Sequence, residues 1–196
     1  NVSGRNSDFP EIVKMNQSRV NFSEKIEKEF VKDSDIILIC VQDRYISETV
    51  SKINSFNIDL SGKFFMHTSG SQTSDVFKGG SMNTENVLSL HPIQTFDKIS
   101  TGNNHLLENI YFGIEGGVNG MEIGKEIIEK LNSKFIEIPK DKKHLYHSAC
   151  VISSNFLVTL LNISSEIMGS IGIEKRKTFD IFKPIIEKTL ENISED

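Results

Sequence analysis

Apolar residues in the first 140 positions form short continuous runs separated by polar segments. The run IILICV at 36–41 has no polar alternation, and the runs within GKFFMHTSG and ENVLSLHPIQTF are similar. A strand buried on both faces has this pattern, which is typical of a parallel sheet covered by helices. We therefore predict a strand in each run, and two further strands at 110–115 and 134–138.

Helical signals alternate with these strands. Asp43 is suited to cap the helix that follows the first run, and Pro10 suits the first turn of an earlier helix. Strands and helices in repeated order predict an α/β layered fold for a domain over residues 1–139. The predicted helices cover residues 9–16, 23–32, 43–53, 73–77 and 118–131.

One long helix is predicted from Asp141 to about Ser170, with Asp141 as its cap and Gly172 just past its end. Its second half is apolar nearly all round, so it must be buried on all sides. The neighbouring sequence, including a second helix at 177–193, is too short to wrap it. We therefore expect residues 140–196 to form a helical domain through which the chain makes a homodimer.

Composition limits the classes of partner. The net charge is −5 and the pI about 5.6, so nothing favours nucleic acid. Cys40 and Cys150 lie in apolar segments, which indicates free thiols in a reducing, cytoplasmic compartment. No apolar run reaches membrane-spanning length, no signal peptide precedes the domain, and the cysteine and histidine spacings predict no metal site.

Polar residues gather where three predicted strands end. The groups are Gln42-Asp43, the turn His67-Thr68-Ser69-Gly70, and His91-Pro92. Ligands of open α/β sheets bind beyond the carboxyl ends of the strands, so together these groups indicate a binding site. Each group alone is equally compatible with ordinary turn chemistry.

The polar half of the long helix carries a second set of candidates. Lys143, His147 and Ser154 fall close to one helical stripe, and Tyr146 and Asn155 flank it. Such groups can polarise a carbonyl or imine and move a proton. The alternative is a solvated helix end in which His147 and Asn155 bond to nearby backbone.

Several motifs together resemble a known family. VQD, HTSG, SLHPIQTF, IEGG and LYHSACVISSNFLVTLL occur in the order found in Rossmann-like proteins that carry the domain of unknown function DUF2520. These proteins are relatives of pyrroline-5-carboxylate reductase, ketopantoate reductase and 6-phosphogluconate dehydrogenase. The resemblance implies an N-terminal NADP-type (or NAD-type) nucleotide domain and a C-terminal helical dimerisation domain.

The resemblance also assigns roles to individual residues. It places Ser3, Arg5 and Asn6 in a turn that holds the ribose phosphate, and it places the three strand-end groups beside the cofactor. The strand-end residues are Val41, Gln42, Asp43, His67, Thr68, Ser69, Gly70, His91 and Pro92. The start of the central helix, which faces the cofactor, contributes Lys143, Tyr146, His147 and Asn155.

Two departures from the family pattern concern the ends of the chain. The sequence has no G-x-G-x-x-G turn after a first strand, and Gly113, Gly116 and Gly117 lie too late in the chain and follow the wrong strand. The sequence also stops at about ENISED, where family members continue into a further segment. The expectation is therefore a Rossmann-like domain without its first strand and glycine loop, followed by a truncated helical domain.

Three hypotheses for function follow. The first is an NADP-dependent reductase of a small carbonyl or imine substrate, in which Lys143, Tyr146 or His147 donates the proton and Asn155 orients the substrate. The second is a nucleotide-binding module without turnover, and the third is a structural dimer. Substrate turnover separates the first from the second, and cofactor binding separates both from the third.

Overall fold

A computed structural model describes residues 2–3, 22–96 and 105–195. The chain divides into two compact units, residues 1–147 and 148–196, which we describe separately. This division falls a few residues after the sequence-based boundary at 139/140, inside the long helix. The helix at 9–16 and the residues Arg5 and Asn6 lie outside the described residues.

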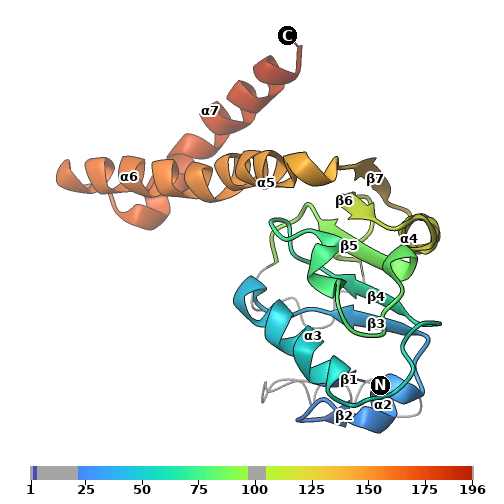
Figure 1. Cartoon of the computed structure of the whole chain (residues 1–196). Helices are drawn as coiled ribbons and strands as arrows, with labels where there is room; N and C mark the ends of the chain where they lie inside the picture. The colour runs from blue at the N-terminus through green and yellow to red at the C-terminus, as the bar shows by residue number, and fades with distance from the viewer. Residues whose placement is uncertain (1, 4–21, 97–104, 196) are drawn as a thin grey trace. The chain divides into compact units, whose positions relative to one another are not determined.

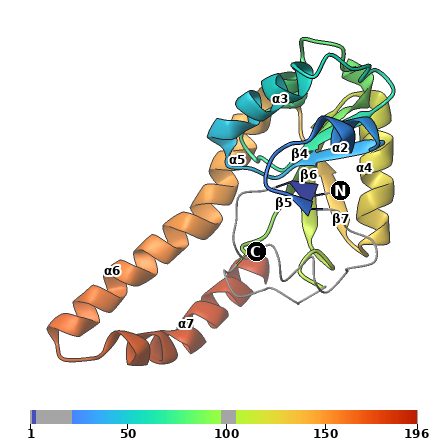
Figure 2. The same cartoon turned by 90° about the horizontal axis from the view of Figure 1, so that it is seen from below.

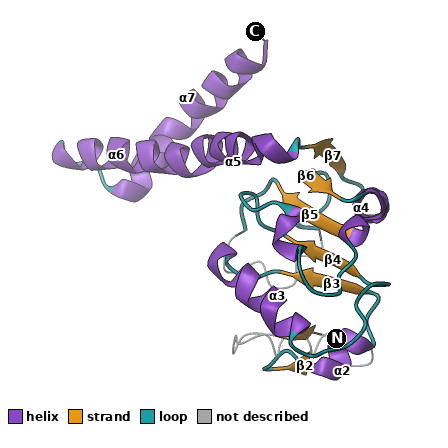
Figure 3. Ribbon diagram, in the orientation of Figure 1, coloured by secondary structure: helices purple, strands orange, loops and turns teal. Residues whose placement is uncertain are grey.

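The first unit is built on a five-stranded sheet of order β3-β4-β5-β6-β7 (Figure 3). β5 and β6 are antiparallel and the other neighbours are parallel, so the sheet is mixed, with parallel pairs predominating. The Rossmann-like α/β prediction is confirmed. Two short strands, β1 (Val2–Ser3) and β2 (Phe22–Ser23), form a separate parallel pair. The five strands are β3 (Ile36–Ile39), β4 (Phe64–His67), β5 (Val87–Pro92), β6 (Tyr111–Gly116) and β7 (Lys134–Glu137).

The two faces of this sheet are covered by different elements. α3 (Ile46–Asn54) and the 3₁₀ turn η2 (Ser74–Phe77) share one apolar cluster with Phe65 and Ile39. α4 (Val118–Lys130) covers Leu88 and Ile114 on the opposite face (Figure 1). The remaining helical segments of this unit are α2 (Lys28–Lys32), η1 (Asp43–Tyr45), η3 (Thr84–Asn86) and η4 (Lys140–Lys142).

The structure corrects three local predictions. Ile36 and Leu38 are 42% and 50% exposed, because β3 is the edge strand and α4 does not reach that part of the face, so two-sided burial of this run is wrong. The helix expected from Ser23 begins at Lys28, since Ser23 lies in β2 and its hydroxyl accepts from the Lys25 amide. Asp43 caps no helix, because its carboxylate binds two serine hydroxyls instead.

The second unit consists of helices. α5 (Lys143–Val151) crosses the boundary between the units and continues through a π-helical turn, Ile152–Phe156, into α6 (Leu157–Ser170). Gly172 follows with φ +85°, and α7 (Lys175–Glu195) completes the unit (Figure 2). The long helix and its terminating glycine are therefore confirmed. Asp141 does not cap the helix, since it lies inside η4, a turn that begins after Pro139.

Apolar side chains of the helical unit remain largely exposed in the single chain. Leu160, Ile167 and Ile185 are each more than 60% exposed. By length and composition alone, the helix Lys140–Ser170 is apolar enough to cross a membrane. The expectation that no segment reaches that length is therefore wrong, although a helix covered by another protein surface has the same composition.

Candidate active site

A row of polar residues crosses the sheet on the face opposite α4. His67 of β4 is in register with Ser89 of β5, which is in register with Glu115 of β6. Residues directly opposite each other in neighbouring strands point to the same face. All three are buried, with at most 4% exposure, although this face is otherwise apolar towards β3. Polar groups this deeply buried must be satisfied by partners.

His67 is held by the turn that follows it. The Ser69 amide donates to Nδ1 at 3.2 Å, so Nε2 carries the hydrogen and donates to the Thr73 carbonyl, also at 3.2 Å. Burial lowers the pKa of His67 to about 4, which keeps the ring neutral. Both ring nitrogens are used within the protein, so His67 shapes the turn and has no nitrogen left for a cofactor.

The ends of β3 and β4 are tied together by Asp43. Its carboxylate accepts from the Ser69 hydroxyl at 2.8 Å and the Ser71 hydroxyl at 2.6 Å, and Gln72 Nε2 donates to its carbonyl oxygen at 2.6 Å. Partial burial alone would raise the pKa of Asp43, but the hydrogen bonds from Ser71 and Ser69 lower it overall. The predicted strand-end groups are thus brought together at one edge of the sheet, where the side chain of Gln42 is exposed.

Lys143, at the start of α5, is buried over the polar row. Its ammonium donates to the Ser89 hydroxyl at 2.5 Å, and its Nζ lies 3.9 Å from Glu115 Oε2. Burial lowers the pKa of Lys143 to about 8, although Glu115 opposes the shift. Lys143 is only 1% exposed, so it binds to the sheet rather than presenting its amine to a substrate.

One turn further along α5, Tyr146 pairs with His91. The Tyr146 hydroxyl lies 2.6 Å from His91 Nδ1, and the rings meet edge to face with centroids 5.6 Å apart. Gly113 is opposite His91 in β6, and a Cβ at Gly113 would overlap the Tyr146 hydroxyl. The missing side chain of Gly113 therefore makes the space for Tyr146.

His147 completes this group of side chains. Its ring lies edge to face with that of His91, with centroids 6.1 Å apart. A Cβ added at Gly70 would lie 2.5 Å from His147 Nδ1 and 2.8 Å from His91 Nε2, so Gly70 is required for this close approach. His147 Nδ1 is buried and has no hydrogen-bond partner among the described residues. A buried polar atom of this kind is a candidate for contact with a ligand.

Comparison with known proteins agrees with the sequence motifs. None of the curated proteins compared with the chain matches it significantly. Residues 110–196 match the DUF2520 family model. The resemblance inferred from the sequence is therefore confirmed, and the matched segment includes Glu115, Lys143, Tyr146 and His147.

Solved structures share the fold over almost the whole chain. Protein TM1727 from Thermotoga maritima is 26% identical with a TM-score of 0.71, and the alignment covers 99% of this chain and 70% of that one. BF3122 from Bacteroides fragilis, provisionally assigned as an NADP oxidoreductase, is 17% identical with a TM-score of 0.73, covering 100% and 71%. Pyrroline carboxylate reductase from Plasmodium falciparum, with NADP bound, is 11% identical with a TM-score of 0.66, covering 99% and 78%.

Two further predicted site residues belong to other elements. Ser3 belongs to β1, and Asn155 is an exposed residue of the π-helical turn in the helical unit. An extra residue per turn in this segment invalidates the 3.6-residue period that aligned Ser154 and Asn155 with Lys143. Asn155 belongs to the second unit, so its role in the site remains a prediction.

Ser89 and Glu115 were not predicted, although the sequence carried a signal. In β5 and β6, polar or small residues alternate with Leu, Phe and Ile, and this alternation marks one face of the strands as polar.

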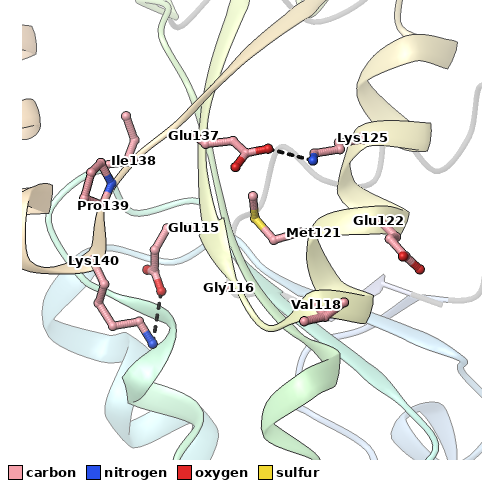
Figure 4. Close-up of a pocket in the computed structure, with 10 residues that line it drawn as sticks. All are labelled: Glu115, Gly116, Val118, Met121, Glu122, Lys125, Glu137, Ile138, Pro139 and Lys140. Carbon is pink, nitrogen blue, oxygen red and sulfur yellow. Dashed lines mark ion pairs between the residues drawn. The ribbon is translucent and has the colours of Figure 1, made fainter.

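A separate groove of about 570 Å³ lies where β6 and β7 end beside the start of α4 (Figure 4). Its lysines, Lys125 and Lys140, are already paired with Glu137 and Glu115, so the groove offers a ligand no free cation among its lining residues.

Proposed function

We propose that this protein is an NADP-dependent oxidoreductase that reduces a small carbonyl or imine, with NAD as the alternative cofactor. The observation that carries the proposal is the His91–Tyr146 pair at the end of β5. A phenol that is hydrogen-bonded to an imidazole is a suitable proton donor to a substrate that is being reduced. Among proteins of this fold, the Plasmodium falciparum reductase binds NADP, which supports the same chemistry here.

The residues of the proposed site have different roles. We assign the hydrogen of His91 to Nδ1, which then donates to the Tyr146 oxygen 2.6 Å away, and the Tyr146 phenol would transfer its proton to the substrate oxygen or nitrogen. The His147 ring lies edge to face with that of His91, and its unpartnered Nδ1 would orient a polar group of the ligand. When bound, the nicotinamide supplies the hydride. Lys143, first considered as a proton donor, instead fixes α5 to the sheet through Ser89.

The residues at this edge fit the nicotinamide end of such a cofactor. Gly70 lets His91 and His147 pack closely against the turn, and His147 Nδ1 and the exposed Gln42 amide can bond to polar groups of the cofactor. The described residues contain no glycine-rich turn that would bind the pyrophosphate. The chain as described therefore supports recognition of the reactive end of the cofactor.

We further propose that a second copy of the chain covers the helical unit. Its exposed apolar residues lie on both helices, which favours a long protein contact over isolated surface residues. Lysine and glutamate pairs interrupt the apolar surface of α7, and a partner protein leaves such a polar face in water. Sedimentation in detergent-free buffer tests the proposal, because a folded monomer, or a protein recovered only with membranes, would contradict it.

Turnover tests the proposed chemistry directly. We expect the protein to oxidise NADPH in the presence of at least one member of a panel of small 2-oxo acids, aldehydes and cyclic imines. Replacing Tyr146 by Phe should lower kcat by roughly 10²- to 10⁴-fold, the contribution of a positioned proton donor. Tyr111→Phe is the matched control, because Tyr111 is 47% exposed on the same sheet and should retain full activity.

Each failure has its own meaning. NADPH binding without oxidation of any panel member would favour a nucleotide-binding module. Equal loss of activity in Tyr146→Phe and Tyr111→Phe would remove Tyr146 from the proton-donor role.

A further inference from the structure

Lys143 is a buried cation that needs a counter-charge. Moving an ammonium from water into a protein interior costs several kcal/mol unless an opposite charge and hydrogen bonds compensate. Ser89 supplies one hydrogen bond, and the Glu115 carboxylate is near enough to supply the opposite charge, at 3.9 Å. Glu115 therefore explains how a lysine with 1% exposure is accommodated.

The carboxylate of Glu115 is itself fixed from several directions. Ser74 donates to it twice, from its amide at 2.9 Å and from its hydroxyl at 2.6 Å, and Lys140 Nζ lies 3.3 Å away. Both carboxylate oxygens are therefore used within the protein. Glu115 thus connects β6 with η2, η4 and α5 through one buried negative charge.

This charge pair lies next to the His91–Tyr146 pair in a regular arrangement. Ser89 is two residues before His91 on the same face of β5, and Lys143 is three residues before Tyr146 on α5. The first layer of contacts contains Glu115 and Lys143, and Ser89 of β5 accepts from Lys143 of α5. The next layer contains His91 and Tyr146. A change of charge at Glu115 or Lys143 therefore changes the electrostatic potential at His91.

The electrostatic effect has a definite sign. The pKa of His91 is lowered to about 4; burial is the largest cause, the charges of His147 and Lys143 act in the same direction, and Asp43 opposes them. His67, on the neighbouring strand, acts in the same direction as Lys143. At the pH where His91 would gain a proton, Lys143 is already fully charged, since its pKa is about 8.

We propose that Glu115 and Lys143 are positioning residues that add to burial in holding the His91 imidazole neutral, so that Tyr146 is the proton-carrying group of the site. Glu115 keeps Lys143 charged, and the charge of Lys143 disfavours a proton on His91. The catalytic meaning of this arrangement rests on the proposed oxidoreductase function. The protonation states themselves can be measured without a substrate.

The test is an NMR titration of histidine side chains in the full chain, with His91 assigned from a His91→Gln variant. The wild type should show His91 neutral down to below pH 5. Lys143→Met should raise the midpoint of His91 by roughly half to one pH unit, because a nearby charge is removed. Lys142→Met removes a 60%-exposed lysine from the adjacent position and should leave the midpoint within about 0.2 unit. A wild-type midpoint near 6.5, or an unchanged midpoint in folded Lys143→Met, overturns the proposal.

A second titration does not depend on the folding of Lys143→Met. In wild-type protein with isotope-labelled lysine, one amine should titrate near pH 8, well below the ordinary lysine value. Glu115→Gln should lower that midpoint further. An unchanged lysine midpoint in folded Glu115→Gln would show that Glu115 does not keep Lys143 charged, and the proposal would fail. Absence of NADPH oxidation would refute the proposed function alone, since these midpoints do not depend on turnover.

Discussion

The two units of the molecule differ in which side chains they bury. In the sheet unit, two apolar clusters are buried, and the polar residues on the sheet face, such as His67 and Glu115, have partners on neighbouring elements. In the helical unit, large apolar side chains are exposed, while Thr178 and Ser165 are buried. The Ser165 hydroxyl oxygen has no partner among the described residues.

This difference shows which unit can be understood from one chain. The sheet unit has a core and a connected set of polar contacts, so its geometry follows from its own residues. The helical unit exposes apolar surface that a folded protein normally covers, so under the proposed association a second copy would contribute to its stability. Four changes test the comparison, in order of decreasing expected effect.

The largest effect should come from removing the charge at the centre of the sheet unit. Glu115→Ala leaves Lys143 buried without its counter-charge and Ser74 without its acceptor, so it should destabilise the sheet unit by about 3–5 kcal/mol. Glu137→Ala is the control, since Glu137 pairs with Lys125 at the surface and should cost at most about 1 kcal/mol. Chemical denaturation measures both, and equal losses would show that the buried network is unimportant.

The next effect concerns the helical unit. Ile167 is 63% exposed in the single chain, and Ile167→Glu should weaken self-association by about 3 kcal/mol, or more than 100-fold in Kd. Lys188→Glu changes the charge of an exposed polar residue of α7 and should leave association nearly unchanged. Sedimentation velocity over a concentration series makes the comparison. An Ile167→Glu protein that still associates like the wild type would contradict coverage by a second copy.

A third effect is the acid sensitivity of the sheet unit. The folded pKa of His67 is about 4 and its ordinary value is 6.5, so the unfolded chain binds the proton more readily between these values. Stability should therefore be complete above pH 6.5 and fall as the pH drops towards 4, by about 2 kcal/mol between pH 7 and 5 from this residue. Denaturation of the wild type and of His67→Gln at the two pH values measures the difference. An identical pH dependence in both proteins would exclude His67 as its source.

The smallest effect on stability should come from Gly113→Ala. The added Cβ meets the end of the Tyr146 side chain, which can rotate, so the cost should be only about 1–2 kcal/mol. The Tyr146 hydroxyl must nevertheless leave His91, and activity should fall as in Tyr146→Phe. Gly62→Ala introduces a Cβ with no atom within 4 Å and serves as the control. Full activity in a folded Gly113→Ala protein would separate the His91–Tyr146 pair from catalysis.

Much of the fold could be predicted from the sequence, since the apolar runs of β4 and β5 and the helix from Asp141 to Ser170 carry strong local signals. The pairing of β5 with β6 in antiparallel orientation has no such signal, because it depends on contacts between distant residues. Exposure of Leu38 could not be foreseen either, because it depends on how far α4 extends over the sheet.

The sequence predicted which candidate residues lie together better than it predicted their contacts. His91, Tyr146 and His147 do come together, and the strand-end turns of Asp43 and Ser69 meet. Lys143 was assigned to the substrate because a lysine on a polar stripe resembles an exposed one. Its burial requires a carboxylate from β6, and Glu115 was predicted only as the end of the strand at 110–115.

The measurement that tests the central claim most directly is the addition of NADPH to isotope-labelled protein, followed by NMR. Binding of the nicotinamide at the ends of β3, β4 and β5 predicts saturable shifts of the resonances of Gly70, His91 and Tyr146, with Gly62 unaffected. Smaller shifts with NADH at the same concentration would establish the preference for NADP. If the resonances of Gly70, His91 and Tyr146 stay unchanged at saturating NADPH, the polar face of the sheet is not a nicotinamide site and the proposed function is wrong.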